Sequence, residues 1–274
     1  MFNQLEILSD EQSEKLYTIR SYFKNLDSAC IAYSGGVDST LVASLAFEQL
    51  GSKAIAITGI SPALANTLRE EARSQAKWIG VKHLEIKTSE LEQSNYSKNP
   101  MDRCFACKKE LHKHTTYLSK KLNYKIVLDG VNLDDLKDYR PGIQASKQAG
   151  VVSPLAKFKF SKQDIRDISK ALGFPWWDKP AQPCLSSRFP YGHEITSERL
   201  KMVEKAEEYL KEGGLSEVRV RCQGSTARIE IPQHELKNFF SKYNFSELVQ
   251  YFSNLGFNCT SLDLEGLISG KLNR

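Results

Sequence analysis

Residues 30–39 read CIAYSGGVDS, and this stretch decides the fold. Its apolar start, CIAY, has the composition and length of a buried strand. The helical run STLVASLAFEQL ends at Gly51, a residue that commonly terminates helices. Between strand and helix, Gly35 and Gly36 carry no Cβ, so the backbone can curl and present N–H groups to phosphate oxygens. The start of a helix also favours negative charge, and the stretch therefore predicts a nucleotide phosphate site.

Three polar side chains complete the predicted loop. Ser34 and Ser39 offer hydroxyl donors to phosphate. The carboxylate of Asp38 would repel phosphate unless a divalent cation lay between them, so the loop also implies Mg²⁺. The G-x-x-x-x-G-K-[ST] pattern of a Walker A motif is missing from the sequence. A Gly-Gly turn alone is usually a plain connection, but the full SGGVDS string after a strand favours a nucleotide site.

Apolar strands and amphipathic helices alternate from the loop to about Gly173. The expected strands are KAIAITGI, HLEIK and YKIVLDG, and the expected helices include ALANTLREEARSQAKWIG and SKQDIRDISKALG. Ser161 is the expected N-cap of the last helix and Gly173 its C-cap. The apolar face of that helix comprises Ile165, Ile168 and Leu172. This alternation predicts an α/β fold, a parallel sheet with helices on both faces and ligands at the carboxyl ends of its strands.

The pattern changes after Pro180. A helix, SERLKMVEKAEEYLKEGG, leads to a strand, EVRVRCQ, a short turn at Gly224, and a second strand, ARIEI. One or two helices and a strand beginning FNCTSL follow. This order predicts a smaller α+β domain with an antiparallel hairpin. We expect two domains, 1–180 and 181–274, joined within FPWWDKPAQPCLSSRFPYG.

Length and charge bound the possible functions. The chain has 274 residues, enough for one large or two medium domains. No apolar run approaches the ~20 residues of a membrane span, and the start of the sequence has no signal-peptide core, so a cytoplasmic location is expected. The net charge of +5 suits an anionic nucleotide. The basic residues are scattered, however, which speaks against a nucleic-acid partner.

The six cysteines form two groups. Disulfides are not expected in a cytosolic chain. Apolar neighbours or strand spacing predict that three are buried: Cys30, Cys222 and Cys259. Polar and turn residues surround the other three, which are Cys104, Cys107 and Cys184. The residues alone leave three interpretations of this second group open: cysteines packed in a core, part of a zinc site that lacks a fourth ligand, or ligands of a [4Fe–4S] cluster with one open iron.

Longer strings extend the pattern beyond the loop. They are NPMDRCFACK, GVNLDDLKDYRPG, SPLAKFKFSKQDIRDISKALGFPWWDKPAQPCLSSRFPYG and EVRVR, in this order. Together with SGGVDS, which matches the PP-loop of the ATP pyrophosphatases, they strongly resemble the LarE family of ATP-dependent sulfur transferases over almost the whole chain. The resemblance implies that ATP is cleaved to AMP and pyrophosphate and that a carboxylate of pyridinium-3,5-biscarboxylic acid mononucleotide is adenylated. Sulfur then replaces the activated oxygen, on the way to the nickel-pincer nucleotide cofactor of lactate racemase.

The LarE family divides by cysteine content. In one branch a single cysteine, at the position of Cys184, gives up its own sulfur and ends as dehydroalanine. In the other branch three cysteines hold a [4Fe–4S] cluster whose open iron carries sulfide for transfer. Cys104, Cys107 and Cys184 occupy all three positions, so the chain resembles the cluster type. Sacrificial donation by Cys184 is the alternative.

The resemblance also implies roles for polar residues, position by position. ATP and Mg²⁺ would be held by the loop residues Ser34, Gly35, Gly36, Asp38 and Ser39. Lys108 would contact phosphate, while Ser187 and Arg188 would contact the substrate phosphate or the adenylate. Functional positions of the second domain match Glu207, Arg219 and Arg221. Arg188 and Glu207 are, with Cys184, the expected catalytic residues.

Ordinary explanations exist for the charged residues of the second domain. Strand alternation places Arg219 and Arg221 on one face, where they could bind an anion or simply face solvent. Glu207 belongs to the string EKAEEY, which is typical of a solvated helix face. For these three residues the sequence leaves both interpretations open.

Two other functions compete with sulfur transfer. A PP-loop tRNA thiolase should carry a stronger basic surface or an added RNA-binding module, and neither is visible in the sequence. A nucleotide-binding module without chemistry is disfavoured by the intact SGGVDS string and the Cys184 segment. The expected partners are the small pyridinium mononucleotide and, by resemblance, further copies of the chain in a hexamer.

Overall fold

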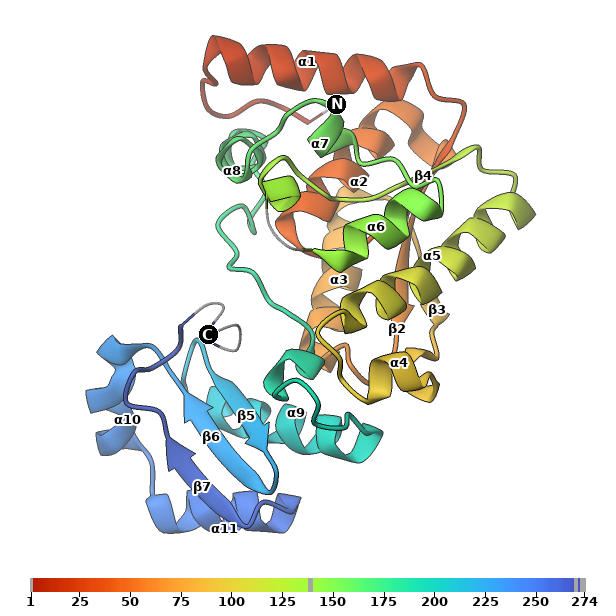
Figure 1. Cartoon of the computed structure of the whole chain (residues 1–274). Helices are drawn as coiled ribbons and strands as arrows, with labels where there is room; N and C mark the ends of the chain where they lie inside the picture. Colours follow the sequence, from red (N-terminus) through yellow and green to blue (C-terminus); the bar gives the residue numbers. More distant parts are fainter. Residues whose placement is uncertain (1, 138–139, 269–270, 272–274) are drawn as a thin grey trace. The chain divides into compact units, whose positions relative to one another are not determined.

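A computed structural model describes residues 2–137, 140–268 and 271, which form two compact units (Figure 1). Unit 1 contains Met1–Ser61, Asn66–Glu90 and Asp102–Gln182. Unit 2 contains Pro62–Ala65, Leu91–Met101 and Pro183–Arg274. The sequence predicted one boundary after residue 180. The structure adds two short segments from the N-terminal part of the chain to unit 2.

Unit 1 is built on a four-stranded parallel sheet, which confirms the predicted α/β fold. The strand order is β3-β2-β1-β4, with bounds Lys82–Lys87, Ala54–Ile60, Ala29–Ala32 and Ile126–Leu128. The main helices are α1 (Asp10–Lys24), α2 (Val37–Leu50), α3 (Asn66–Ile79), α5 (Arg103–Lys121), α6 (Pro141–Gln148), α7 (Pro154–Lys157) and α8 (Lys162–Ala171). Short turns of helix lie at η1 (Gly51–Lys53), η2 (Glu90–Glu92) and η3 (Asp134–Lys137). The central strand β1 therefore delivers the glycine loop at its carboxyl end.

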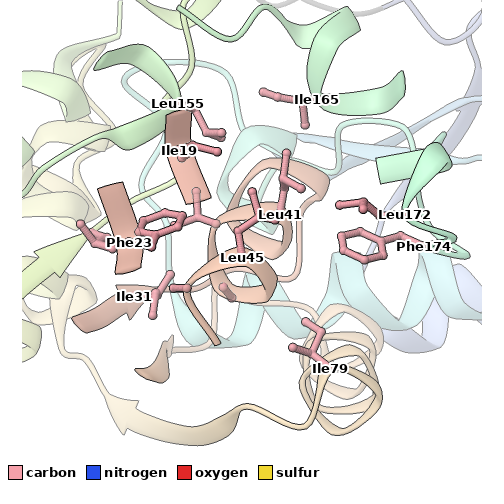
Figure 2. Packing of buried hydrophobic residues seen from close by; sticks show 14 of the residues in the cluster. Ile19, Phe23, Ile31, Leu41, Leu45, Ile79, Leu155, Ile165, Leu172 and Phe174 are labelled. Atoms are coloured by element: carbon pink, nitrogen blue, oxygen red, sulfur yellow. The ribbon is translucent and has the colours of Figure 1, made fainter. Parts of the chain in front are cut away.

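Alternate residues of β1 and β2 pack their side chains into two apolar clusters, one on each face of the sheet. Ile31 and Ala56 pack in the larger cluster with side chains from α1, α2, α3, α7 and α8 (Figure 2). Cys30, Ile55 and Ile57 pack in the smaller cluster, which includes Leu118 of α5. Side chains of successive strand residues point to opposite faces, and here both faces are covered. This is why the strands read as continuous apolar runs instead of alternating ones.

Helix α8 begins at the predicted N-cap, Ser161, but its C-cap is Leu172, one residue before the predicted Gly173. The Ser161 side chain accepts a hydrogen bond from the Asp164 backbone N–H, and the Asp164 carboxylate accepts one from the Ser161 N–H in return. This capping box satisfies two N–H groups that would otherwise lack a partner. Gly173, just past the helix, has a φ of +74°, which a glycine adopts without strain. Ile165 and Ile168 are fully buried in the core.

Unit 2 contains a three-stranded sheet of order β5-β6-β7, with bounds Arg219–Gln223, Thr226–Glu230 and Cys259–Leu262. Strands β5 and β6 form the predicted antiparallel hairpin, and β7 pairs in parallel with β6. The helical elements are α4 (Ser94–Ser97), η4 (Leu185–Arg188), α9 (Ser197–Glu212), η5 (Gln233–Glu235), α10 (Leu236–Lys242) and α11 (Phe245–Leu255). The second, α+β part of the fold prediction is thus also confirmed.

The prediction that Cys259 is buried was wrong, because its side chain is exposed. Phe257 is buried, but it follows α11 as part of the helix ending and lies before β7 begins. Strand alternation therefore does not run from Phe257 to Cys259. Cys259 opens an edge strand in which no residue is fully buried. Cys30 and Cys222 are buried, as predicted.

No helix of the described ranges is both long enough and apolar enough to span a membrane.

Candidate active site

The glycine loop of unit 1 is shaped by a close approach of helix α3. Gly35 has a φ of +71°, in the left-handed region that favours glycine. A Cβ added to Gly35 would lie 3.0 Å from both Cα and Cβ of Ala72 on α3. Gly130, at the end of β4, approaches the loop from another direction, because a Cβ there would lie 2.7 Å from the Ser39 backbone nitrogen. Backbone packs against backbone at both positions, so a larger residue would displace the loop.

The two serines of the loop bond to each other and to the loop backbone. The hydroxyls of Ser34 and Ser39 lie 3.1 Å apart. The Ser39 hydroxyl also accepts from the Ser34 N–H at 3.2 Å and lies 3.1 Å from the Gly36 carbonyl oxygen. Helix α2 begins at Val37 with Gly36 as its N-cap, and no side chain of the described residues caps it. Its first N–H groups and these hydroxyls provide the donors that a phosphate group requires.

The Asp38 carboxylate lies at the same end of the sheet and has two polar partners. Lys162, at the start of α8, places its Nζ 2.7 Å from Oδ1 and 2.6 Å from Oδ2 of Asp38. Asn132, after β4, donates from Nδ2 to Oδ1 at 3.3 Å. The side-chain oxygen of Asn132 accepts from the backbone N–H groups of Asp134 and Asp135, which fixes the amide toward Asp38. Asp38 thus has polar partners and keeps 24% of its side-chain surface exposed.

Sequence reasoning missed Lys162 and Asn132 as loop partners, although each carried a signal. Lys162 is the first residue of α8, where the helix dipole disfavours a cation. A lysine at that position indicates a role other than helix stability. Asn132 follows the strand β4, where a parallel sheet collects ligand-binding residues. Neither signal identifies Asp38 as the partner.

The Cys-x-x-Cys pair lies on the first turns of α5, in unit 1. Cys104 is exposed and Cys107 is half-buried, and residues three apart on a helix lie on one face. Lys108 packs its stem against α6, since a Cβ on Gly142 would lie 2.9 Å from the Lys108 Cγ. Burial, assisted by the positive charge of Lys108, lowers the pKa of His112 to about 3. His112 is therefore neutral and adds no positive charge beside Lys108.

Cys184 belongs to unit 2, where it precedes the short helix η4. The Leu185 N–H donates to the Ala63 carbonyl oxygen at 2.9 Å, and the Ser186 hydroxyl lies 2.6 Å from the Tyr96 hydroxyl in a buried position. These bonds explain why the segments around Ala63 and Tyr96 belong to unit 2 and not to unit 1. Cys184 itself is half-buried. Within the described ranges, no group of three or more His, Cys, Asp or Glu side chains is placed to hold a metal ion.

Arg188 and Glu207 form a buried, two-bond ion pair in unit 2. Nε and Nη2 of Arg188 donate to the two Glu207 oxygens at 2.8 and 2.9 Å. Arg188 also donates through Nη1 to the Ser187 hydroxyl at 2.9 Å, while Glu207 accepts the Val220 N–H at 2.9 Å. Burial alone would lower the pKa of the Arg188 guanidinium, but Glu207 raises it above its ordinary value. Glu207 is 4% exposed, so the solvated-helix interpretation of this residue was wrong.

Arg221 is also buried and paired, which rules out the solvated-strand interpretation for it. Its side chain is 2% exposed, donates through Nε to Glu230 at 2.9 Å, and donates through Nη1 to the Ser187 carbonyl oxygen at 2.6 Å. Arg219 differs, because no carboxylate of the described residues forms an ion pair with it. Burial, followed by the positive charges of Arg188 and Arg221, lowers the pKa of the Arg219 guanidinium. Among the three arginines, Arg219 is thus the one for which the described residues supply no paired carboxylate.

Glu207→Gln is expected to lower the free energy of unfolding by about 2–3 kcal/mol, because it leaves the buried Arg188 without its counter-charge. Chemical denaturation monitored by circular dichroism measures the change. Glu208→Gln is the matched control, because Glu208 is a neighbouring glutamate that is partly exposed. The pKa of Glu208 is raised by partial burial and by the negative charges of Glu204 and Glu212. Equal stability of the two variants would contradict the structural role of the Arg188–Glu207 pair.

Comparison with known proteins gives two relatives along almost the whole chain and one along about half of it. An uncharacterized protein of Synechocystis is 54% identical over 260 residues, covering 95% of this chain and 97% of that protein. The pyridinium-3,5-bisthiocarboxylic acid mononucleotide synthase of Lactiplantibacillus plantarum is 33% identical over 261 residues, covering 94% of each. The NH3-dependent NAD+ synthetase of Finegoldia magna is 28% identical over 156 residues, which are 55% of this chain and 63% of that enzyme. A search of protein-family models finds no match.

Proposed function

Because the chain belongs to the same family as the pyridinium-3,5-bisthiocarboxylic acid mononucleotide synthase of L. plantarum, we propose that it is an ATP-dependent sulfur transferase. Its substrate would be pyridinium-3,5-biscarboxylic acid mononucleotide, whose carboxylates become thiocarboxylates. The observation that carries this proposal is the relationship over 94% of both chains. The glycine loop of unit 1 and three arginines of unit 2, Arg188, Arg219 and Arg221, support it independently.

The first step uses the loop of unit 1. The N–H groups at the start of α2 and the hydroxyls of Ser34 and Ser39 would hold the ATP phosphates, and Asp38 would hold Mg²⁺. The similarity to an NH3-dependent NAD+ synthetase over 55% of this chain supports nucleotide chemistry. A substrate carboxylate oxygen attacks the α-phosphorus, and pyrophosphate leaves. The acyl adenylate that forms has a good leaving group, AMP, where the free carboxylate would have to expel oxide.

The second step uses residues of unit 2. Arg219 would contact the substrate phosphate, because it keeps a positive charge that no described carboxylate pairs with. Arg221 and Arg188 are held by Glu230 and Glu207, so they would position Arg219 and the Cys184 segment. Ser187 joins both, since Arg188 donates to its hydroxyl and Arg221 to its carbonyl oxygen. Lys108 of unit 1 is proposed to contact phosphate.

Sulfur delivery is proposed to depend on Cys104, Cys107 and Cys184. Their donor chemistry suits a [4Fe–4S] cluster, since all three are thiols and Cys104 and Cys107 lie on one helix face. When bound, the cluster supplies an open iron to carry sulfide. Without it, the Cys184 thiolate would attack the acyl adenylate and AMP would leave. Loss of the Cys184 Cα proton to a base, with cleavage of the Cβ–Sγ bond, would then release the thiocarboxylate and leave dehydroalanine.

The proposal is tested by incubating anaerobically purified protein with ATP, Mg²⁺ and the pyridinium substrate. We expect AMP and pyrophosphate to form only when the substrate is present, together with a product in which sulfur replaces a carboxylate oxygen, detected by mass spectrometry. Formation of AMP without a sulfur-containing product would support adenylation of the substrate but refute sulfur transfer. Light scattering under the same conditions measures the proposed homo-oligomer, a hexamer by family resemblance.

Arg219→Ala is expected to raise the KM for the pyridinium substrate about 10- to 100-fold, since a lost charge-assisted contact costs about 1.5–3 kcal/mol. The KM for ATP should change little, because the ATP phosphates are assigned to unit 1. Lys237→Ala removes an exposed positive charge on α10 and serves as the matched control. If both variants show wild-type kinetics, Arg219 is an ordinary surface charge.

A further inference from the structure

The side chain of Gln75, on α3, links the two ends of the glycine loop. Tyr33 directly precedes the loop, residues 34–39, and Thr40 directly follows it. The Gln75 Oε1 atom accepts a hydrogen bond from the Tyr33 hydroxyl at 3.2 Å and another from the Thr40 hydroxyl at 3.0 Å. One amide oxygen therefore receives a donor from each end of the loop.

These hydrogen bonds are closed off from water. The side chains of Tyr33, Thr40 and Gln75 are all buried. Burial raises the pKa of Tyr33 to about 12, although a hydrogen bond with the Thr40 side chain opposes the shift, so the phenol keeps its proton and remains a donor. Since water cannot replace a lost partner here, removal of the shared acceptor would leave buried hydroxyls without one.

Helix α3 also supports the backbone of the loop. The close approach of Gly35 is to Ala72, three residues before Gln75 and on the same face of the helix. The Tyr33 hydroxyl lies 3.3 Å from the Ala72 carbonyl oxygen as well. One face of α3 thus contacts both the turn of the loop and its ends, although no residue assigned to the phosphates belongs to this helix.

We propose that Gln75 is a positioning residue that sets the conformation of the glycine loop by holding both of its ends on α3. It acts through Tyr33 and Thr40 and not on the phosphates. In this arrangement the loop donors are already ordered when ATP binds, so binding does not have to supply the free energy of ordering them. This inference rests on the proposed binding of ATP at the loop and adds to that site a residue from α3.

Gln75→Met keeps the length of the side chain and removes the acceptor. Amide hydrogen exchange in a peptide covering residues 33–42, measured by mass spectrometry, should become about fivefold faster, because the loop opens more often. The KM for ATP should rise about 5- to 30-fold, while the KM for the pyridinium substrate stays at the wild-type value. A merely structural loss would reduce the amount of active protein, which lowers kcat and leaves both KM values unchanged.

The partner of Gln75 on α2 offers a second route to the same hydrogen bonds. Thr40→Val has nearly the same shape and removes one donor, so it should shift loop exchange and the KM for ATP in the same direction but less, even if Gln75→Met does not fold. Adding Thr40→Val to Gln75→Met should change little, because both substitutions break one interaction. Gln148→Met replaces an exposed glutamine of α6 and is the matched control, with wild-type values expected throughout.

Wild-type loop exchange in Gln75→Met, or a lower kcat with an unchanged KM for ATP, would overturn the proposal. Full additivity of Gln75→Met and Thr40→Val would also overturn it, since the two residues would then act separately. If the wild-type protein itself makes no AMP, the proposed function fails, whereas loop exchange in the variants still tests whether Gln75 holds the loop.

Discussion

Asp38→Ala is expected to lower the rate of AMP and pyrophosphate formation by about 10³-fold or more. In the proposed mechanism Asp38 holds the Mg²⁺ that stabilises charge on the transferred phosphorus, a contribution of several kcal/mol. The loop donors around it, Ser34 and Ser39, cannot substitute, because hydroxyls neutralise no charge. The rate is measured with saturating ATP and pyridinium substrate, by release of pyrophosphate.

The fold of the Asp38→Ala variant should survive. The Asp38 side chain is 24% exposed, and its partners Lys162 and Asn132 are polar. Loss of a partly exposed ion pair costs at most about 1 kcal/mol, so thermal unfolding should shift only slightly. Asp27→Ala is the matched control, because Asp27 is an exposed aspartate that precedes the other end of β1. Full activity of Asp38→Ala would mean that the glycine loop is only a turn.

Replacing any one of Cys104, Cys107 and Cys184 with alanine is expected to abolish sulfur transfer and to lower bound iron. A cubane held by three thiolates leaves one iron accessible, and two thiolates do not hold it stably. Iron content and broad visible absorbance of anaerobically purified protein should therefore fall together in each variant. Cys259→Ala is the matched control, since Cys259 is an exposed thiol of unit 2 outside the proposed set.

The sacrificial mechanism predicts a different pattern for the same variants. Only Cys184→Ala would lose activity, and Cys104→Ala and Cys107→Ala would stay active. The wild-type protein would lose one sulfur and two hydrogens at Cys184 during turnover, which intact-protein and peptide mass spectrometry detect. Colourless, iron-free wild-type protein with that mass loss would make Cys184 a single-use sulfur donor and refute the cluster.

The sequence alone was sufficient for the parts of unit 1 that depend on local signals. The strings CIAY, SGGVDS and STLVASLAFEQL predicted the strand, the turn and the helix α2, because apolar runs, glycine conformation and helix ends are set by neighbouring residues. The cap at Ser161 acts within one turn of α8 and was also predicted correctly, whereas the C-cap is Leu172, one residue before the predicted Gly173. Alternation of apolar strands and helices then indicated the parallel sheet, since crossover helices cover both faces of such a sheet.

Burial of charged residues was decided only by the tertiary structure. Charged side chains are exposed in most proteins, so EKAEEY reads as a solvated helix face, and burial becomes tolerable only when a partner neutralises the charge. The partner of Glu207 is Arg188, 19 positions away, and the partner of Asp38 is Lys162, 124 positions away. Folding brings these groups within hydrogen-bonding distance, and no spacing rule along the chain encodes such a pairing. The sequence by itself therefore determined the sheet and the glycine loop, whereas the charge partners around them were decided by packing of distant segments.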